Sequence, residues 1–265
     1  MGLFLRVLPV GMYAGRSRML VERSLLVNRR AWLTAVSGFC EPLFFLLAMG
    51  VGLGSLVGDV PGPVGTSSFV GFVAPALLAA SAMNGAIYDA TFNIFSKIKY
   101  ARLYDAMLAT SLGPIDVAVG EITWALLRGG LYASGFLAVL LTLGLVTSPW
   151  ALLALPAALL VAFSFAAVGM ACTTFMRSWQ DFDLIQLVLT PMFLFSTTFF
   201  PLTVYPGFVA AVVRCLPLYH AIELMRELCA GVVEVGLLAH VAYFAVMAGV
   251  GVLVSVRRLG VLLLR

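Results

Sequence analysis

The stretch that decides the fold is Trp150–Met176, WALLALPAALLVAFSFAAVGMACTTFM, in which no side chain is charged. It is longer than the roughly 20 apolar residues that an α-helix needs to cross the hydrocarbon core of a bilayer. Ser148-Pro149 precedes it as a tight turn, and a short polar link beginning at Arg177 follows it. The stretch therefore predicts a membrane-spanning helix.

The composition of the whole chain points the same way. Hydrophobic residues make up 62% of the chain and charged residues 11%, and the mean hydropathy is +1.08. Soluble domains are about half apolar and about a quarter charged, so this composition excludes a soluble globular enzyme, a disordered regulator and a nucleic-acid-binding domain. The net charge of +4 is too small to indicate a nucleic-acid partner. At about 20 residues per span, the 265 residues hold about six spans with short loops.

Five further apolar runs flank this stretch. They cover residues 31–57, 69–95, 117–146, 184–200 and 236–256. Glu41-Pro42 interrupts the first run, and Asp89 is the only charge in the second. The fifth run ends near Phe200, because the prolines between residues 191 and 206 break or kink a helix.

Arginines dominate residues 1–30, where Glu22 is the single acid. We expect residues 16–30 to form a helix that lies along the membrane surface. Leu3–Val10 is short and Arg6 interrupts it, so we do not expect a secretory signal peptide.

Residues 201–235 are expected to enter the membrane without crossing it. Gly207–Leu216 and Leu218–Ala230 predict helices of about 15 and 20 Å, which are shorter than a hydrocarbon core of about 30 Å. Pro217 separates the two helices, and Gly231 suits the C-terminus of the second. The sequence therefore predicts an outer re-entrant helix pair before the last span.

The distribution of basic residues predicts the orientation. With six spans and a cytoplasmic N-terminus, 13 of the 16 lysines and arginines lie on the cytoplasmic side, as the positive-inside rule requires. Counting 207–230 as a seventh span would place the last arginines outside and several charges in lipid. We therefore expect an all-α polytopic protein of the cell membrane, with one transmembrane domain over residues 1–265, six transmembrane helices and both termini cytoplasmic.

Several catalytic signatures are absent from the sequence. No G-x-x-x-x-G-K-[ST] loop is present to hold nucleotide phosphates. His220 and His240 are isolated in the sequence, so we expect no metal site. No G-x-S-x-G elbow occurs, and the acids within the spans are scattered. We therefore expect a transport subunit that is not an enzyme and that binds no cofactor itself.

A proline-punctuated stretch carries the most specific motif. It consists of Pro191-Met-Phe-Leu-Phe-Ser-Thr-Thr-Phe-Phe-Pro201, Pro206, Leu216-Pro217-Leu218, Glu223-Leu-Met-Arg226 and Gly231. It resembles the C-terminal signature of the ABC-2 type exporter permeases, in which an F-P precedes a second proline, an L-P-L-like step and an arginine ahead of a glycine. Glu41-Pro42 and Tyr104–Thr110 resemble the nodulation-factor branch, which together with the daunorubicin-resistance type is the most similar part of the family. Thr197-Thr198 departs from the Ser-Gly of many members and predicts a bulkier, stiffer turn.

The resemblance implies a half-transporter that pairs with a second copy or a homologous permease and binds two separate ATPase subunits, which hold ATP and magnesium. Residues 97–114, the most polar internal stretch, are the candidate cytoplasmic coupling helix. Its candidate contact residues are Arg102, Asp105, Met107 and Leu108, because apolar side chains between charges indicate a docked surface. The alternative is an ordinary solvated loop.

Polar residues on the second span form one helical stripe. Ser81, Asn84 and Tyr88 fall at i, i+3 and i+7, and they are the candidate lining of a substrate path. The alternative is that they form polar contacts between helices.

The second helix of the re-entrant pair carries the candidate outer gate. His220, Glu223 and Glu227 fall on one face, and Arg226 is within reach of Glu223. Charges at membrane depth are tolerated where they face protein or a water-filled cavity, so we expect this face to border the outer mouth of the path. The alternative is an anchor at the lipid headgroups.

Other charges and two cysteines remain open at this point. Glu41, Asp89, Glu121 and Arg128 lie in or near spans, where a structural role is as plausible as transport. Glu121 and Arg128 are two helical turns apart, too far to pair with each other. Nothing in the sequence decides whether a disulfide joins Cys215 and Cys229.

We therefore interpret the sequence as the membrane subunit of an ATP-driven exporter that moves a lipophilic or amphipathic substrate, such as a drug, lipid or glycolipid. The first alternative is a stand-alone secondary drug or ion transporter, which the lack of paired interrupted helices disfavours. The second is a membrane-embedded enzyme or scaffold, which the lack of clustered His, Cys or Asp disfavours. Expected partners include membrane lipids but no nucleic acid.

Overall fold

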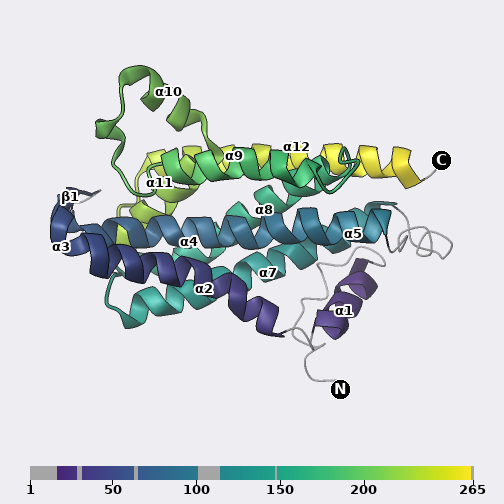
Figure 1. Cartoon of the computed structure of the whole chain (residues 1–265), viewed down its shortest axis with the longest axis horizontal. Coiled ribbons are helices and arrows are strands. Elements are labelled where there is room, and N and C mark those ends of the chain that lie inside the picture. Colours follow the sequence, from purple (N-terminus) through teal and green to yellow (C-terminus); the bar gives the residue numbers. More distant parts are fainter. Residues whose placement is uncertain (1–16, 29–31, 63–64, 101–113, 147, 264–265) are drawn as a thin grey trace.

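The computed structural model describes residues 17–28, 32–62, 65–100, 114–146 and 148–263. Long helices lie side by side along one axis, and short elements lie at the two ends of the bundle (Figure 1). The helices in chain order are α1 Ser17–Asn28, α2 Trp32–Ala48, η3 Met49–Leu53, α3 Gly54–Val57, α4 Phe69–Tyr88, η4 Asp89–Asn93, α5 Ile94–Lys99, α7 Pro114–Thr142, η5 Pro149–Leu153, α8 Ala154–Thr173, α9 Asp181–Phe195, η6 Leu202–Val204, α10 Gly207–Cys215, α11 Pro217–Ala230 and α12 Val235–Leu263.

Helix α4 is the centre of the bundle. It packs against α2, α7, α8 and α11, and 83% of the most apolar part of the α4–α5 span is buried, against 17% for α12. Small residues make this packing close: a Cβ at Gly129 of α7 would lie 2.9 Å from the Ala162 Cβ and 3.1 Å from the Ala82 carbonyl oxygen. Such close approach through small residues is typical of helices that associate in a membrane.

Four helical stretches in the described part of the chain are long and apolar enough to cross a membrane. They cover residues 69–99, 116–142, 149–173 and 235–259. Helical residues also run without a break from Trp32 to Val57, through the π-helix η3. Helix α9 has 15 residues, fewer than the roughly 20 of a typical span. The described helices therefore provide four candidate spans of a multi-pass membrane protein, or five if α10 and α11 form one bent span, whereas six spans stay a prediction.

The two short helices α10 and α11 are bent by 83° where they meet, and α10 stands out from one end of the bundle (Figure 1). Pro217 is the first residue of α11, where its fixed φ and missing N–H suit a helix start. Gly231 ends α11 in the left-handed conformation, with φ +81°. Their bounds lie within one residue of the predicted pair, whereas their depth in the membrane stays a prediction.

One small sheet corrects the all-α expectation. Strand β1, Asp59–Pro61, pairs antiparallel with β2, Thr66–Ser68, and Asp59 lies opposite Ser68. A loop was expected here, but the short ladder satisfies backbone groups that a loop would leave to water. Ser68 then caps α4, since its hydroxyl accepts a hydrogen bond from Gly71 N at 3.2 Å.

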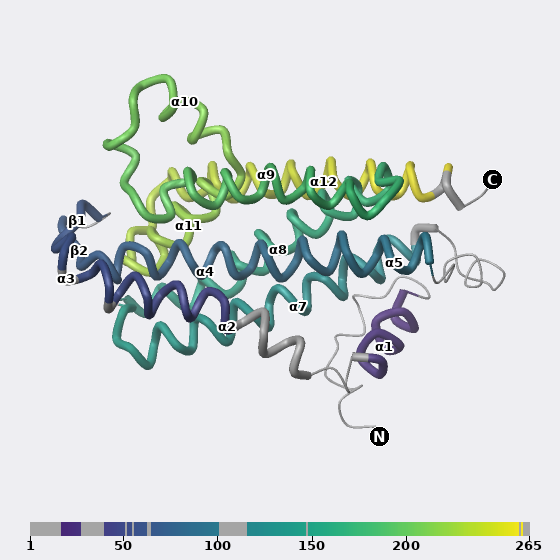
Figure 2. The backbone as a smooth tube through the Cα atoms, viewed as in Figure 1, coloured from purple at the N-terminus to yellow at the C-terminus, as the bar shows by residue number. Residues whose placement is uncertain are grey.

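The ends of the bundle differ in their elements. Helices α1 and α5 and the C-terminal part of α12 lie at one end, whereas α3, β1 and β2 lie at the other (Figure 2). Helix α1 packs against α7, where a Cβ at Gly120 would lie 2.8 Å from the Leu20 Cβ. The predicted surface helix therefore exists as Ser17–Asn28, and its position on a membrane surface stays a prediction.

Candidate functional site

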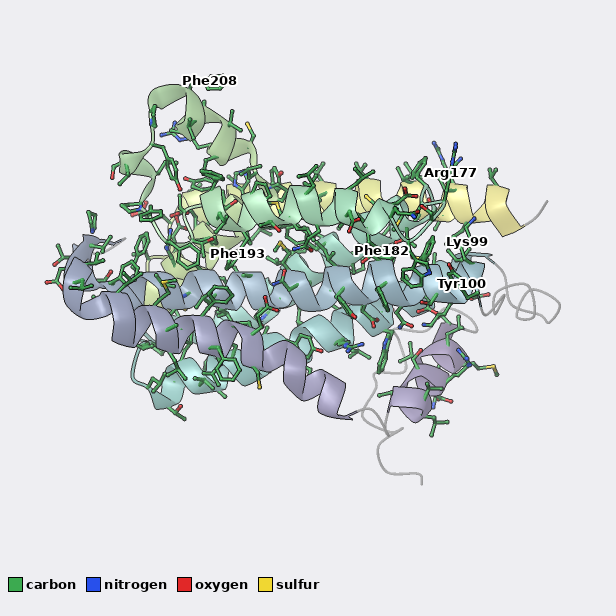
Figure 3. All side chains as sticks on the ribbon, in the orientation of Figure 1. Lys99, Tyr100, Arg177, Phe182, Phe193 and Phe208 are labelled. Carbon is green, nitrogen blue, oxygen red and sulfur yellow. The ribbon has the colours of Figure 1, made fainter. Side chains whose placement is uncertain are left out.

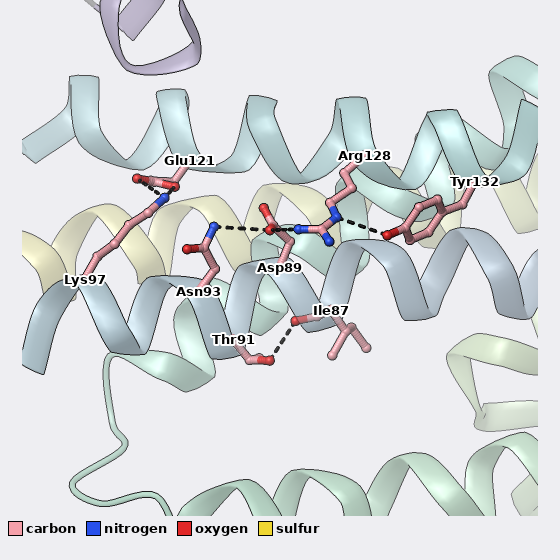
Figure 4. A network of polar contacts seen from close by, with 8 residues as sticks. All are labelled: Ile87, Asp89, Thr91, Asn93, Lys97, Glu121, Arg128 and Tyr132. Atoms are coloured by element: carbon pink, nitrogen blue, oxygen red, sulfur yellow. Dashed lines mark hydrogen bonds and ion pairs between the residues drawn. The ribbon is translucent and has the colours of Figure 1, made fainter. Parts of the chain in front are cut away.

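Two ion pairs join the α4–α5 helix to α7 inside the bundle (Figure 4). Asp89 Oδ1 lies 2.9 Å from Arg128 Nη1, and Glu121 Oε2 lies 2.7 Å from Lys97 Nζ. Arg128 Nε also donates a hydrogen bond to the Tyr132 hydroxyl at 3.1 Å. Both carboxylate side chains are only 2% exposed, so each needs its cation. We call Asp89, Lys97, Glu121 and Arg128 the inner charge cluster.

Helical spacing explains this cluster. Asp89, Asn93 and Lys97 follow one another four residues apart and lie along one side of their helix, where Asn93 Nδ2 donates to Asp89 Oδ1 at 3.2 Å. Glu121 and Arg128 lie two turns apart on α7. Because the two helices are antiparallel, Glu121 meets Lys97 and Arg128 meets Asp89. Glu121 and Arg128 thus each bind a partner on the neighbouring helix, which spacing within α7 alone does not reveal.

The helix carrying Asp89 is widened at this point. Residues 89–93 form the π-helix η4, and the Thr91 hydroxyl donates to the Ile87 carbonyl at 2.7 Å (Figure 4). Single π-helical turns inside α-helices are frequent at functional sites. The sequence of the predicted second span did not indicate this π-helix.

A cavity of about 870 Å³ lies beside the inner charge cluster, between α2, α4, α7 and α9. Its lining combines apolar side chains with polar ones, among them Glu41, Asn84, Tyr88 and Arg128. Of the three predicted path residues, Asn84 and Tyr88 line this cavity. Ser81 is only 1% exposed and does not line it, because it faces the packed interior of the bundle.

Aromatic side chains line the cavity near both ends of α9. At one end, the Trp179 and Phe182 rings lie 4.9 and 5.5 Å from that of Phe92, measured between centroids. At the other end, Phe193 lies 5.7 Å from Phe45 of α2. Phe182 and Phe193 mark the two ends in Figure 3. Helix α9 is thus held along the cavity by aromatic contacts, an arrangement that the sequence analysis missed.

A second buried cluster centres on Arg226 of α11, which is 5% exposed. Its guanidinium donates hydrogen bonds to Glu223 Oε1 at 2.9 Å, to the Thr197 hydroxyl at 3.1 Å and to the Phe72 carbonyl at 3.3 Å. It also donates to the Thr197 carbonyl and lies 3.8 Å from the centroid of the Phe72 ring. We call Thr197, Glu223 and Arg226 the outer charge cluster.

Thr197 has an unusual backbone in this cluster. Its φ is +62°, a conformation that a β-branched residue rarely adopts. The turn ends α9 before Pro201, and Thr198 donates to the Phe193 carbonyl to close it. The expected stiff turn at Thr197-Thr198 is therefore a strained, buried turn, and Arg226 donates a hydrogen bond to the Thr197 carbonyl.

The four predicted gate residues separate into different contacts. Glu223 and Arg226 form an ion pair, whereas Glu227 Oε2 is buried without a hydrogen-bond partner among the described residues. His220 faces α12, where its Nδ1 lies 2.8 Å from His240 Nδ1. The two histidines, isolated in the sequence, are therefore neighbours in space. No group of three or more potential metal-binding side chains occurs within the described ranges.

The predicted coupling residues Arg102, Asp105, Met107 and Leu108 lie outside the described residues. Helix α5 continues to Lys99, so the start of the predicted 97–114 segment is the end of the α4–α5 helix and contains Lys97 of the inner charge cluster. Cys215 lies at the surface and Cys229 in the interior, and no disulfide joins these two described residues.

A bundle of membrane-spanning helices that encloses a partly polar cavity beside buried ion pairs is the architecture of a membrane transport protein. Comparison with known families also indicates a membrane transport protein. The chain belongs to the ABC-2 type transporter family, which matches residues 17–229. It is therefore a permease of an ABC exporter, a transport subunit that catalyses no reaction itself.

Similar proteins cover most of the chain. Nodulation protein J of Rhizobium meliloti (strain 1021) is 33% identical over 220 residues, which is 82% of each protein. Nodulation protein J of Rhizobium leguminosarum bv. viciae is 32% identical over 236 residues, 88% of this chain and 90% of the relative. Nodulation protein J of Bradyrhizobium diazoefficiens is 30% identical over 207 residues, 77% of this chain and 78% of the relative.

Proposed function

We propose that this permease moves a lipophilic or amphipathic molecule, such as a drug, lipid or glycolipid, out of the cell through the cavity between α2, α4, α7 and α9. The observation that carries the proposal is the mixed lining of that cavity. Leu77, Leu189 and Phe193 supply apolar surface, while Asn84 and Arg128 supply polar groups. A molecule with apolar and polar parts matches such a lining.

We propose six spans, with the helix from Trp32 to Val57 as the first and α9 as the fifth, and both termini in the cytoplasm. The distribution of cations supports this orientation. Lys99 and Arg177 lie at the same end of the bundle (Figure 3), and α12 carries Arg257 and Arg258 near its C-terminus at that end as well. A cytoplasmic position for this end follows the positive-inside rule.

ATP hydrolysis would occur on two partner ATPase subunits, which would hold ATP and magnesium, and a second copy or a homologous permease would complete the pathway. Family membership supports an ATPase partner. The proposed contact is residues 97–114, whose first three residues are the end of α5. A displacement of this segment would act on Lys97, which binds Glu121 of α7. Through the same helix it would act on Asp89, which binds Arg128 of α7 and accepts a hydrogen bond from Asn93.

The outer gate would be the α10–α11 pair. Glu223 supports this role, because it is half-buried and pairs with Arg226 at a place where α11 meets α4 and the end of α9. Glu223→Gln weakens that pair while preserving its shape, so we expect altered export or increased leak with normal assembly. Wild-type export in this variant would leave only an anchoring role for the pair.

Reconstitution with the ATPase partner tests the export function. We expect ATP-dependent efflux of an amphiphile from liposomes, and reduced efflux in Asn84→Leu, since that change removes a polar group from the cavity. Ser134→Ala on α7 is the matched control, because Ser134 only donates to the Gly130 carbonyl of its own helix and does not line the cavity. Transport that needs an ion gradient and no ATPase would instead indicate a secondary transporter.

Two further measurements test orientation and coupling. Single cysteines at positions 62 and 148 should react with an impermeant reagent from outside, and one in the C-terminal tail should not; labelling of the tail in intact cells would contradict the topology.

The coupling segment is tested by substitution. Arg102→Glu or Met107→Pro should lower substrate-stimulated ATPase activity while membrane insertion persists. Unchanged coupling in the proline variant would exclude the segment as a coupling helix.

A further inference from the structure

We infer that the cavity selects amphiphiles whose polar head donates hydrogen bonds and carries no negative charge, and that Glu41 is the main selecting residue. The inference rests on the proposed role of this cavity as the substrate path. It follows from the charge balance of the lining, from the depth of Glu41 in its helix and from the aromatic rings that line the same cavity.

Among the described residues that line the cavity, acidic side chains outnumber basic ones. Glu41, Arg128 and Asp183 are the charged side chains among the described residues that line the cavity. Arg128 is neutralised by Asp89 at 2.9 Å, and its Nε is bound to Tyr132. The carboxylates of Glu41 and Asp183 have no ion pair within the described part of the chain. Among the described lining residues, the cavity therefore presents two carboxylates without an ion pair, and the one cation there is already engaged.

The position of Glu41 makes this charge significant. It lies nine residues after Trp32 in a helical stretch that runs to Val57, so it is well inside the predicted first span. A carboxylate at such depth is costly unless it faces a cavity or a partner. Pro42, next to it, lacks an N–H and leaves a backbone carbonyl of the same helix without its usual donor. The Glu41 carboxylate thus presents to the cavity an acceptor that a hydrogen-bond-donating head group can bind.

The rest of the lining suits the two halves of one amphiphile. Tyr88, Phe92 and Trp179 line the same cavity as Asp183 and pack against one another, and aromatic faces attract cations and apolar C–H groups but not anions. Apolar side chains such as Leu189 and Leu194 continue along α9. A head with hydroxyl or ammonium donors would satisfy Glu41 and Asp183, whereas an anionic head would meet like charges.

Three matched amphiphiles test the inference. Each has the same fluorescently labelled 12-carbon chain, and the head is glucose, glucosamine or glucuronic acid, which is neutral, cationic or anionic at pH 7. Binding is measured with the permease and its ATPase partner in nanodiscs. We expect the glucuronide to bind at least about ten-fold more weakly than the glucoside in the wild type, and Glu41→Gln to narrow this ratio to about three-fold or less. Asp59→Asn, which removes an exposed carboxylate of β1 outside the cavity, should leave the ratio unchanged.

The outcomes separate this inference from the export function. Equal binding of the three amphiphiles, no binding of any of them, or an unchanged ratio in Glu41→Gln overturns the inference. ATP-driven export of the glucoside with no charge dependence overturns the inference and leaves the export function standing. Charge-selective binding without ATP-driven export of any of the three supports the selective site and contradicts the proposed export through it.

Discussion

The inner and outer charge clusters differ in what their cations bind. In the inner cluster, Arg128 and Lys97 bind carboxylates across the interface of two helices, and both cations keep some exposure, 15% and 13% of the side chain. In the outer cluster, Arg226 is 5% exposed and binds the main-chain carbonyls of Thr197 and Phe72 as well as Glu223. The inner cluster joins two helices side by side, whereas the outer cluster supplies hydrogen-bond donors to a non-helical turn.

This difference separates a contact between two helices from a contact on which the shape of a turn depends. Backbone groups outside a helix must find partners where lipid replaces water, so the turn at Thr197 depends on Arg226. The inner pairs instead lie between two complete helices and beside the cavity, so they can exchange partners without unfolding either helix. We therefore expect the outer cluster to dominate stability and the inner cluster to dominate transport.

Arg226→Met should have the largest effect on stability. It leaves the Thr197 and Phe72 carbonyls without a donor and Glu223 without its cation, and breaking a buried pair of this kind costs about 3–5 kcal/mol. We expect a strong loss of folded protein in a detergent thermal-unfolding assay. Arg226→Lys should recover little, because a lysine cannot reproduce the several directions of the guanidinium. Wild-type stability in Arg226→Met would remove the contrast between the clusters.

Arg128→Met should have the next largest effect on stability. It leaves the buried Asp89 carboxylate without its cation, at a cost of roughly 3 kcal/mol. Adding Asp89→Asn removes the stranded charge, so the double variant should regain most of the thermal stability while export stays low. A double variant that regains export as well would show that the ion pair is only structural.

Lys97→Met should have a smaller effect on stability, about 1–2 kcal/mol. Lys97 lies near the end of α5, where water can approach Glu121 after the change. Coupling should suffer more than stability, because residues 97–114 are the proposed ATPase contact. The measurement compares thermal unfolding with substrate-stimulated ATPase activity, and equal losses in both would argue against a coupling role.

Thr197→Gly should have the smallest net effect, within about 1 kcal/mol of wild type. Glycine adopts a φ of +62° without strain, and this gain offsets the lost hydroxyl contacts with Arg226 and Glu223. Thr197→Val is the matched comparison, since it keeps the strain and loses the hydroxyl, and it should be clearly less stable than Thr197→Gly. Equal stability of the two variants would mean that the turn carries no strain.

Local sequence determined the class of this protein. Charge-free runs such as Trp150–Met176 require a membrane, and Pro217 with Gly231 bounds a helix too short to cross it. The family signature around Pro191–Pro201 is also contiguous or nearly so. These features could be predicted because hydropathy, helix starts and helix ends depend on residues close together in the chain.

Only the tertiary structure decided which side chains meet. Arg226 binds the carbonyl of Phe72, which lies 154 residues earlier in the chain, His220 lies against His240 of another helix, and Ser81 turns away from the cavity that Asn84 lines. Such contacts depend on which helices are neighbours and how each is rotated about its axis. That information comes from packing over the whole bundle, because shape and burial select one arrangement among the many that the same helices allow.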